Sequence, residues 1–402
     1  MLEIDQRMRK QLPLGVAAWV NKEGYFIGRI ELPTTAAGAR RRREFRSKDW
    51  GKFLGKAKSL YSQFRDSGDL ATSSPTVRDW MTAWLDDIAA KRVRPKTLAG
   101  YRSVVNKQII EAIGNVRLEK LTPAHVRRVH DHITGNGGSS TYALNAHRIL
   151  SKALEDAIRE GKLYRNPATM LDAPRKARRR LEAFTVDEAV AIVKRCAPAF
   201  ENEPYDPEPA RWATYLLTGA RRGEILGLEW DRVGDELDLS WQLQRIRDVA
   251  NAPADFEYRE IGNGLYWTRP KSLAGWRMIP LVDPLAYILN EHRKRSSPNP
   301  WGLVFANKGK PIDPDTETKR WPTAREAMGV EKGVRLHDLR HTTVDLLYEA
   351  GVAEDIIMEI VGHSVRTVTR GYKSRGNQVR RVEAMRQLSQ YFSGVAPSPL
   401  HE

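Results

Sequence analysis

The strongest constraint on the fold is a helix-breaking and highly charged stretch near the middle of the chain. Asn166 and Pro167 end any preceding helix, because proline restricts the residue before it and has no backbone N–H to donate. Thr185 and Glu188 then form a capping-box pattern, which predicts that a new helix begins. Between these two points lies a basic connector that contains Arg175, Lys176, Arg178, Arg179 and Arg180. A chain of 402 residues divided in this way predicts several domains.

A second break lies at residues 66–75, where Ser, Gly, Asp and Thr gather ahead of Pro75 as in a linker. The two breaks predict a small module at 1–65, a domain at 76–170, a connector at 171–183 and a larger domain at 184–402. The last of these would carry a C-terminal tail from about residue 373.

The first module has the pattern of a small sheet packed by one helix. Apolar residues alternate over 16–20 and again over 26–32, and residues 21–24 between these runs predict a hairpin turn. A third strand is expected at 41–46. Apolar residues then recur at helical spacing from Trp50 to Phe64, which predicts a helix that covers the sheet.

Residues 76–168 are helical in pattern throughout and predict a unit of four helices. Trp80 and Trp84 lie one turn apart, Gly114 ends a helix headed by Thr97, Thr122 caps another, and a fourth runs from about 141 to 161. Residues 184–402 mix helical patterns with strand-like stretches between 237 and 279, followed by three late helices. We therefore expect a multidomain protein: a sheet-plus-helix module, an all-α domain, and a mixed α+β, mainly helical domain.

The positive charge lies almost entirely in the first 180 residues. Net charges are +8 over residues 1–60, −3 over 61–90, +13 over 91–180 and −2 over 181–402, for a total of +16. This distribution predicts that the first part meets a polyanion, with nucleic acid as the leading partner. A membrane surface would favour one basic amphipathic helix instead of charge spread over several elements. Charge alone leaves a solubilising face open as well.

The sequence is that of a packed globular protein in a reducing compartment. Apolar residues make up 41% and charged residues 29%, which excludes a disordered or collagen-like chain. Cys196 is the single cysteine and cannot form an internal disulfide, so we expect a buried thiol. No apolar run approaches the roughly 18 residues of a transmembrane helix, and the short stretch 12–20 is expected to be a strand and not a signal peptide. We expect a cytoplasmic protein.

Five short clusters in the last domain hold reactive side chains. In the first cluster, an arginine follows a Gly-containing turn at a helix start, and in the second a lysine lies in a polar hairpin between Trp267 and Ile279. The third contains a His and an Arg three residues apart. In the fourth a histidine follows a helix end, and the tyrosine of the fifth comes nine residues after that histidine. These side chains are Arg221, Lys271, His337, Arg340, His363 and Tyr372. Each alone has an ordinary structural explanation. Together they suit phosphoryl transfer: arginines bind phosphate oxygens, His and Lys move protons, and Tyr attacks phosphorus.

The sequence contains no carboxylate cluster of the kind that holds magnesium, and the neighbours His337 and Asp338 are a weak metal motif. We therefore expect phosphoryl transfer without a metal ion.

The same residues resemble the tyrosine recombinases, specifically the integrases of phages and mobile elements. The segments that carry the resemblance are TGARRGEILGL, TRPKSLAGWRMIPL, HDLRH, VGHS and GY, in this order. The resemblance covers about residues 76–385. The module at 1–65 resembles the arm-DNA-binding domain that precedes many integrases. The domain at 76–170 resembles the helical core-DNA-binding domain of the family.

The resemblance implies roles for the individual residues. Arg221, favoured over its neighbour Arg222 by the motif spacing, and Arg340 would form the phosphate clamp, and Tyr372 would be the nucleophile. Lys271 would protonate the departing 5′-oxygen, while His337 and His363 would assist proton transfer and hold the phosphate. A 3′-phosphotyrosyl link would conserve the bond energy, so that DNA is resealed without ATP or metal.

The resemblance also implies partners. These are double-stranded DNA at core and arm sites, three further copies of the chain in a tetramer on a Holliday junction, an excisionase and a host DNA-bending factor. The expected place of action is DNA in the cytoplasm of a bacterial host, where the protein integrates phage or mobile-element DNA into the chromosome. The candidate DNA-binding residues are Arg41, Arg42, Arg43, Lys96, Arg102, Arg148, Lys152, Arg178, Arg179 and Arg180.

Three alternatives share part of this pattern. A resolvase or invertase would use the same chemistry, but the extra basic module favours integration. A type IB topoisomerase would also use Arg, Lys, His and Tyr, but the helical unit and the GHS spacing speak against it. A non-catalytic DNA-binding regulator would keep the positive charge but would have lost the reaction. The tail, apolar on one face from Val379 to Phe392, would dock on a neighbouring protomer or pack on its own domain.

Overall fold

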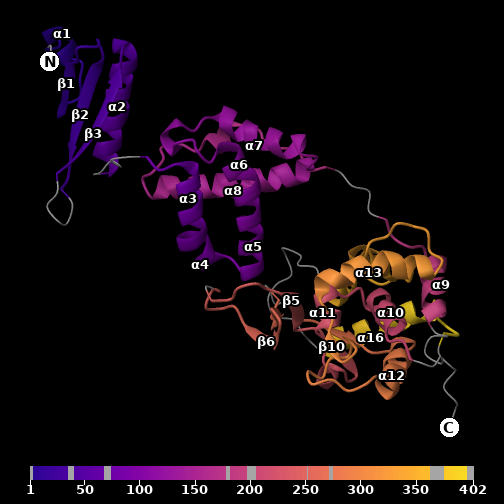
Figure 1. Ribbon diagram of the computed structural model, residues 1–402. Coiled ribbons are helices and arrows are strands. Elements are labelled where there is room, and N and C mark those ends of the chain that lie inside the picture. The colour runs from indigo at the N-terminus through magenta and orange to yellow at the C-terminus, as the bar shows by residue number, and fades with distance from the viewer. Residues whose placement is uncertain are drawn as a thin grey trace. The chain divides into compact units, whose positions relative to one another are not determined.

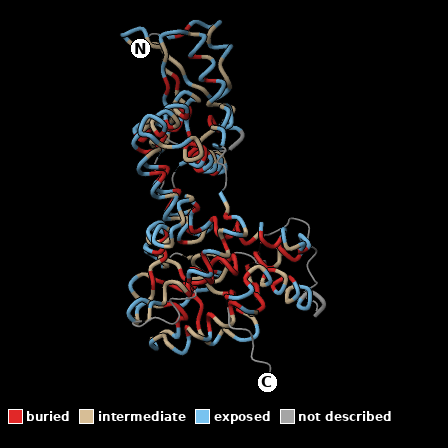
Figure 2. The backbone as a smooth tube through the Cα atoms, turned by 90° about the vertical axis from the view of Figure 1, so that its right-hand side faces the viewer, coloured by how far each residue is buried: buried red, intermediate tan, exposed pale blue. Residues whose placement is uncertain are grey.

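The structure is a computed structural model that describes residues 3–34, 40–67, 74–177, 182–196, 205–250, 252–270, 275–362 and 375–395. Its contacts divide the chain into two units, one of residues 1–93 and 97–178, the other of residues 94–96 and 179–402. Buried residues gather inside each part of the chain (Figure 2). We refer to residues 3–67 as the N-terminal module, 74–177 as the helical part and 182–395 as the C-terminal part.

The N-terminal module is a three-stranded antiparallel sheet covered by one long helix (Figure 1). A short helix, absent from the expected pattern, precedes the sheet. The elements are α1 (Gln6–Arg9), β1 (Val16–Val20), β2 (Phe26–Leu32), β3 (Arg41–Ser47) and α2 (Trp50–Ser67). The expected turn is present, since the side chain of Asn21 accepts hydrogen bonds from the backbone N–H groups of Glu23 and Tyr25. Phe53 and Ala57 of α2 pack on Ile30 and Phe45 of the sheet.

The N-terminal module therefore has the fold expected from its pattern, although the strand expected from residue 12 begins only at Val16.

The helical part consists of four helical segments, two of which contain a π-helical stretch. The first segment is α3 (Val77–Ala83), η1 (Trp84–Ala89) and α4 (Ala90–Arg92); the second is α5 (Pro95–Val104), η2 (Val105–Ile110) and α6 (Glu111–Ile113). The others are α7 (Pro123–Gly135) and α8 (Ser140–Arg159), with short 3₁₀ turns at η3 (Leu118–Lys120) and η4 (Pro167–Met170).

The four segments share one core, and α8 contributes most of its buried apolar residues to it. Two indole N–H groups tie the first segment to α8. The indole of Trp80 donates to the carbonyl of Ala153 at 3.0 Å, and that of Trp84 donates to the buried carboxylate of Asp156 at 2.9 Å. The two tryptophans lie one turn apart, as their i,i+4 spacing predicted, and both contact α8.

The C-terminal part is mainly helical with small sheets. Before its sheets lie α9 (Val186–Cys196), α10 (Glu208–Thr218), α11 (Arg222–Leu226) and the 3₁₀ turn η6 (Trp230–Arg232). The expected capping box of α9 is present: the Thr185 N–H donates to Glu188 at 2.8 Å, and the Glu188 N–H donates to the Thr185 hydroxyl at 3.3 Å. Cys196 is buried as expected.

The described strands of the C-terminal part form three separate sheets. They are β4 (Glu236–Asp238) with β8 (Met278–Pro280), β5 (Gln242–Arg245) with β7 (Leu265–Thr268) and β6 (Tyr258–Gly262), and β9 (Ala306–Asn307) with β10 (Lys310–Pro311). The hairpin expected between Trp267 and Ile279 is wrong, because β7 and β8 belong to different sheets. The β4–β8 pair is instead a stem that closes the segment 239–277, here called the branch. The sheet of this branch packs on the same core as the helices through Leu243, Leu265 and Trp267.

After the stem, the described residues form more helices than the three expected. These are α12 (Leu285–Arg295), α13 (Pro314–Ala327), α14 (Leu339–Glu349) after the 3₁₀ turn η8 (Leu336–Asp338), α15 (Glu354–Val361) and α16 (Arg375–Gln390). The pattern of α13 is weak because Pro322 lies within it, and α12 ends in a run of basic residues. Helix α16 buries Met385 and Leu388 in the core of its own part, which is the second of the two expectations for the tail.

Candidate active site

The turn between α10 and α11 presents Arg221 to the site. Gly219 ends α10 with a φ of 57°, and a Cβ there would lie 3.0 Å from the side chain of Thr343, so glycine suits both the turn and the close approach. Arg221 follows at the N-cap of α11. Its backbone N–H donates to Glu224 at 2.7 Å, and its Nη1 donates to the other carboxylate oxygen at 2.8 Å. Glu224 is buried and therefore fixes the guanidinium of Arg221 in place.

Arg340 lies in the first turn of α14 and is buried. Its Nη1 donates to the carbonyl of Gly219 at 2.9 Å, and its Nη2 donates to the carbonyl of Val361. Burial lowers the pKa of this guanidinium, and the positive charges of Arg277 and Arg221 lower it further. Arg221 and Arg340 are more than 100 positions apart in sequence, but their positive charges lie side by side. This arrangement favours the binding of an anion.

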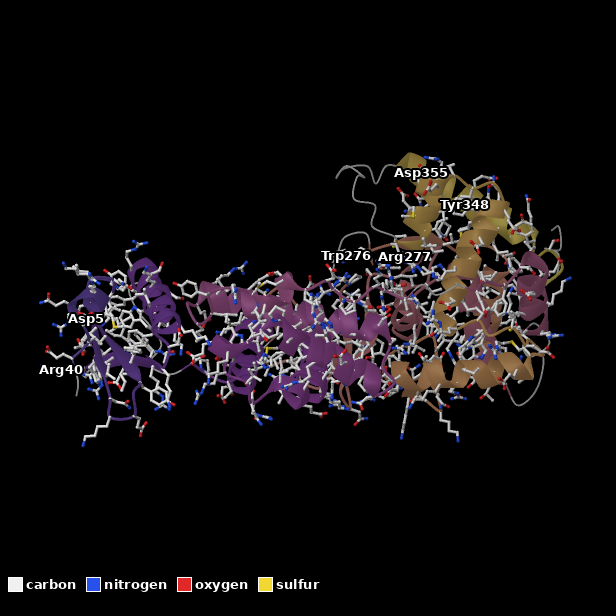
Figure 3. All side chains as sticks on the ribbon, turned by 90° about the horizontal axis from the view of Figure 1, so that it is seen from above. Asp5, Arg40, Trp276, Arg277, Tyr348 and Asp355 are labelled. Atoms are coloured by element: carbon white, nitrogen blue, oxygen red, sulfur yellow. The ribbon has the colours of Figure 1, made fainter. Side chains whose placement is uncertain are left out.

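A third arginine of this cluster, Arg277, was not predicted from the sequence. It precedes β8, next to Trp276 (Figure 3), and is 4% exposed. Its Nη2 donates to Glu224 and its Nη1 to the carbonyl of Ile360. Burial lowers the pKa of Arg277, while Glu224 opposes this effect. The only sequence signal was a lone charge beside the apolar run Met278–Leu281.

The C-terminal end of α15 is held by these three guanidinium groups. Three consecutive carbonyls accept hydrogen bonds: Ile360 from Arg277, Val361 from Arg340, and Gly362 from Nη2 of Arg221, the last at 2.9 Å. Gly362 has a φ of 65°, which ends the helix where the sequence predicted. Arginine side chains thus satisfy carbonyls at the negative end of the helix dipole.

His337 lies in the 3₁₀ turn just before α14, three residues ahead of Arg340. The residue is exposed, but part of its ring lies against the protein. This burial lowers the pKa of the imidazole, and the positive charges of Arg340 and His341 act in the same direction. The neutral ring can accept a proton. The carboxylate of the adjacent Asp338 accepts hydrogen bonds from Nε and Nη2 of Arg335 at 2.7 and 3.0 Å, so this carboxylate forms an ion pair.

A cavity of about 710 Å³ opens beside this cluster, between α11, α13 and the residues before α14. Arg221 and His337 line it together with Arg222 and Arg325, and Trp321 contributes apolar surface. Such a combination of cationic groups and an apolar wall suits a sugar-phosphate chain. Among the residues that the structure describes, no group of three His, Cys, Asp or Glu side chains could hold a metal ion.

Lys271, His363 and Tyr372 lie outside the described residues, so their predicted places are not tested by the structure. Of the six candidate catalytic residues, the structure brings Arg221 and Arg340 together around the end of α15 and places His337 just ahead of Arg340.

The candidate DNA-binding residues lie on several elements. Arg41, Arg42 and Arg43 are on β3, where Arg42 is exposed and the other two are partly buried. Exposed side chains on helices are Lys96 and Arg102 on α5 and Arg148 and Lys152 on α8. The last two are four residues apart and share one face of α8. Arg102 forms an ion pair with Asp86 at 2.7 Å. Arg178, Arg179 and Arg180 lie outside the described residues.

No helix in the part of the chain that the structure describes is long and apolar enough to cross a membrane.

Comparison with known proteins gives a consistent result. Residues 182–378 match the phage integrase family, and residues 76–133 match the N-terminal SAM-like domain of phage integrases. An integrase of Saccharopolyspora erythraea is 27% identical, over 94% of this chain and 96% of its own length.

Solved structures share the fold at lower identity. A lambda integrase tetramer bound to a Holliday junction is 18% identical with a TM-score of 0.53, over 90% of this chain and 99% of that chain. The Tn1549 transposon integrase in complex with circular intermediate DNA is 17% identical with a TM-score of 0.59, over 73% of this chain and 93% of that chain. Sequence motifs, family matches and fold therefore agree, and the chain belongs to the phage integrase family of tyrosine recombinases.

Proposed function

We propose that this protein is a site-specific DNA integrase that cleaves and rejoins strands through a 3′-phosphotyrosyl intermediate. The observation that carries the proposal is the convergence of Arg221 and Arg340 at the end of α15, with His337, whose pKa is lowered by burial, in the adjacent turn. Two guanidinium groups can bind the non-bridging oxygens of one phosphate, as the site of a phosphoryl transfer requires.

In the first step, the hydroxyl oxygen of Tyr372 attacks phosphorus and its proton passes to a neutral base, a role that His337 fits. The bond between phosphorus and the 5′-oxygen breaks, and Lys271 donates a proton to this leaving oxygen. Arg221 and Arg340 stabilise the charge that builds up on the phosphate, and His363 holds it. In the second step, the 5′-hydroxyl of the partner strand attacks the phosphorus of the phosphotyrosyl link and gives its proton to Lys271. The bond between phosphorus and the tyrosine oxygen breaks, and His337 returns the proton that restores the tyrosine hydroxyl. The proposed steps need no metal ion and no ATP.

The proposed assembly is a tetramer on DNA that exchanges strands through a Holliday junction. The lambda integrase neighbour forms a tetramer on such a junction, which supports this part of the proposal. We assign residues 1–65 to arm-site binding, 76–170 and the connector 171–183 to the core site, and 184–402 to catalysis. The basic residues named above would mostly contact phosphates and thereby position the protein. An excisionase and a host DNA-bending factor stay predictions.

The test uses nicked duplexes that carry candidate attachment sites, from which a cleaved strand end diffuses away so that the covalent complex accumulates. The protein is incubated with them in the presence of a chelator and then denatured. We expect a protein–DNA band that is lost in Tyr372→Phe and kept in Tyr348→Phe, a matched control in which an exposed tyrosine of α14 is changed.

A protein that binds a site but forms no covalent band on it would be a regulator and not a recombinase. Recombination between two duplexes is then measured on substrates with arm sites and on substrates without them. This comparison separates integration from resolution or inversion.

A further inference from the structure

Among the described residues, the carboxylate of Glu224 is the one that contacts the three-arginine cluster, and it neutralises only part of the positive charge. Arg221, Arg277 and Arg340 carry three positive charges and Glu224 carries one negative charge, so these four side chains together keep two positive charges. A phosphodiester carries one negative charge, and the five-coordinate transition state of its cleavage carries about two. The charge of the cluster therefore matches the transition state better than the substrate, which is the condition for catalysis.

Arg277 sets this excess because it shares Glu224 with Arg221. Arg277 and the backbone N–H of Arg221 both donate to Oε2 of Glu224, while Nη1 of Arg221 donates to Oε1. Without Arg277, the buried carboxylate would serve Arg221 alone and would neutralise its charge. The other end of the Arg277 guanidinium holds the carbonyl of Ile360, next to the carbonyls that bind Arg340 and Arg221.

We propose that Arg277 is a positioning residue for the phosphate clamp: it divides the charge of Glu224 and anchors the end of α15, so that Arg221 and Arg340 present their charge to the scissile phosphate. The inference rests on the proposed function. Arg277 itself is buried, bonded to Glu224 and Ile360, and it acts through the two other arginines.

A purely structural role is the alternative, since a buried Arg–Glu pair that loses one partner destabilises a protein. The chain offers a matched control for this alternative. Arg211 and Glu317 form another buried Arg–Glu pair in the C-terminal part, and they are 1% and 0% exposed. Arg211→Gln breaks this pair without touching Glu224 or the end of α15.

The experiment compares two forms of an attachment site that the wild-type protein cleaves. One has the natural phosphodiester at the scissile position, and the other has a methylphosphonate, in which a methyl group replaces one non-bridging oxygen and removes the negative charge. Single-turnover cleavage rates, DNA affinity and thermal unfolding are measured for wild type and for Arg277→Gln, Arg277→Lys and Arg211→Gln.

Arg277→Gln keeps a hydrogen-bond donor but loses the charge, and we expect cleavage of the phosphodiester to fall about 10- to 100-fold, with DNA affinity unchanged within about threefold. On the methylphosphonate, the deficit relative to wild type is expected to shrink to a few-fold, since less charge needs compensation. Arg277→Lys keeps the charge and is expected to stay within about fivefold of wild type on the phosphodiester. Arg211→Gln is expected to show the same deficit on both substrates.

Equal deficits of Arg277→Gln on the two substrates would overturn the inference and assign Arg277 a structural role. Cleavage by Arg277→Lys that is as slow as by Arg277→Gln would also overturn it, because the charge would then not be the cause. A wild-type protein that forms no covalent complex refutes the proposed function instead, so the two failures are distinguishable.

Discussion

Removal of the Asp156 carboxylate should destabilise the helical part far more than removal of a surface ion pair. The Asp156 side chain is 4% exposed and accepts hydrogen bonds from the indole of Trp84 at 2.9 Å, from Arg92 at 2.9 Å on each oxygen, and from Arg159 at 3.0 Å. In Asp156→Ala, the buried indole N–H loses its acceptor, at a cost of about 1–3 kcal/mol. Arg92 is half exposed and Arg159 mostly exposed, so water replaces much of what they lose, and together they add roughly 1 kcal/mol.

Asp156→Ala is therefore expected to lower the free energy of unfolding of the helical part by about 2–4 kcal/mol. This corresponds to roughly 30- to 1,000-fold faster hydrogen exchange of those α3 and α8 amides that exchange by local unfolding. Exchange in the full chain, followed by mass spectrometry, measures this for each helix. Asp86→Ala is the matched control, because its 2.7 Å ion pair with Arg102 is solvent-exposed and should contribute less than about 1 kcal/mol. Equal effects of the two variants would refute the reasoning that burial decides the value of these contacts.

Three further predictions concern the C-terminal part. Arg340→Lys should slow cleavage about 10²- to 10³-fold with DNA affinity within about threefold, because lysine cannot hold two oxygens in a fork; cleavage within tenfold of wild type in single-turnover assays would contradict this. Burial raises the pKa of the Cys196 thiol to about 12, so alkylation of the native protein at pH 8 should be slower than that of the unfolded protein by a factor on the order of a thousand. Burial lowers the pKa of His292 to about 4, so the unfolded state binds its proton first as the pH falls, and stability is lost between about pH 6.5 and 4. Urea unfolding at pH 7 and pH 5 should show a loss of about 2 kcal/mol that is absent in His292→Gln.

The local patterns predicted most of the N-terminal module and the helical part because their elements are set by short-range spacing. The alternation from Val16 to Val20 and the periodic apolar residues from Trp50 onward both correspond to elements of the structure. The π-helical stretches at Trp84–Ala89 and Val105–Ile110 could not be predicted, because one extra residue in a turn hardly changes an apolar pattern. The domain boundaries stay predictions.

Long-range pairing was the limit in the C-terminal part. Strand β8 pairs with β4, which lies about 40 residues earlier in the chain, and sequence proximity to β7 led to the wrong hairpin. Arg277 escaped notice for the same reason, since only the tertiary fold decides which arginine is buried against Glu224. The ordered motif predicted Arg221, His337 and Arg340 because each lies at a helix end that local signals define.

The stem has a consequence for where the chain can accept an insertion. The branch leaves and rejoins the C-terminal part at paired positions, since Leu237 faces Ile279 and the Leu239 N–H donates to the Arg277 carbonyl at 3.0 Å. A longer turn within the branch therefore adds little loop-closure entropy, because the junction is already closed and the core residues of the branch are kept. The turn between β6 and β7, at Asn263 and Gly264 with φ values of 53° and 72°, is thus a natural point at which to graft a fluorescent label or an affinity peptide without disturbing the arginine cluster.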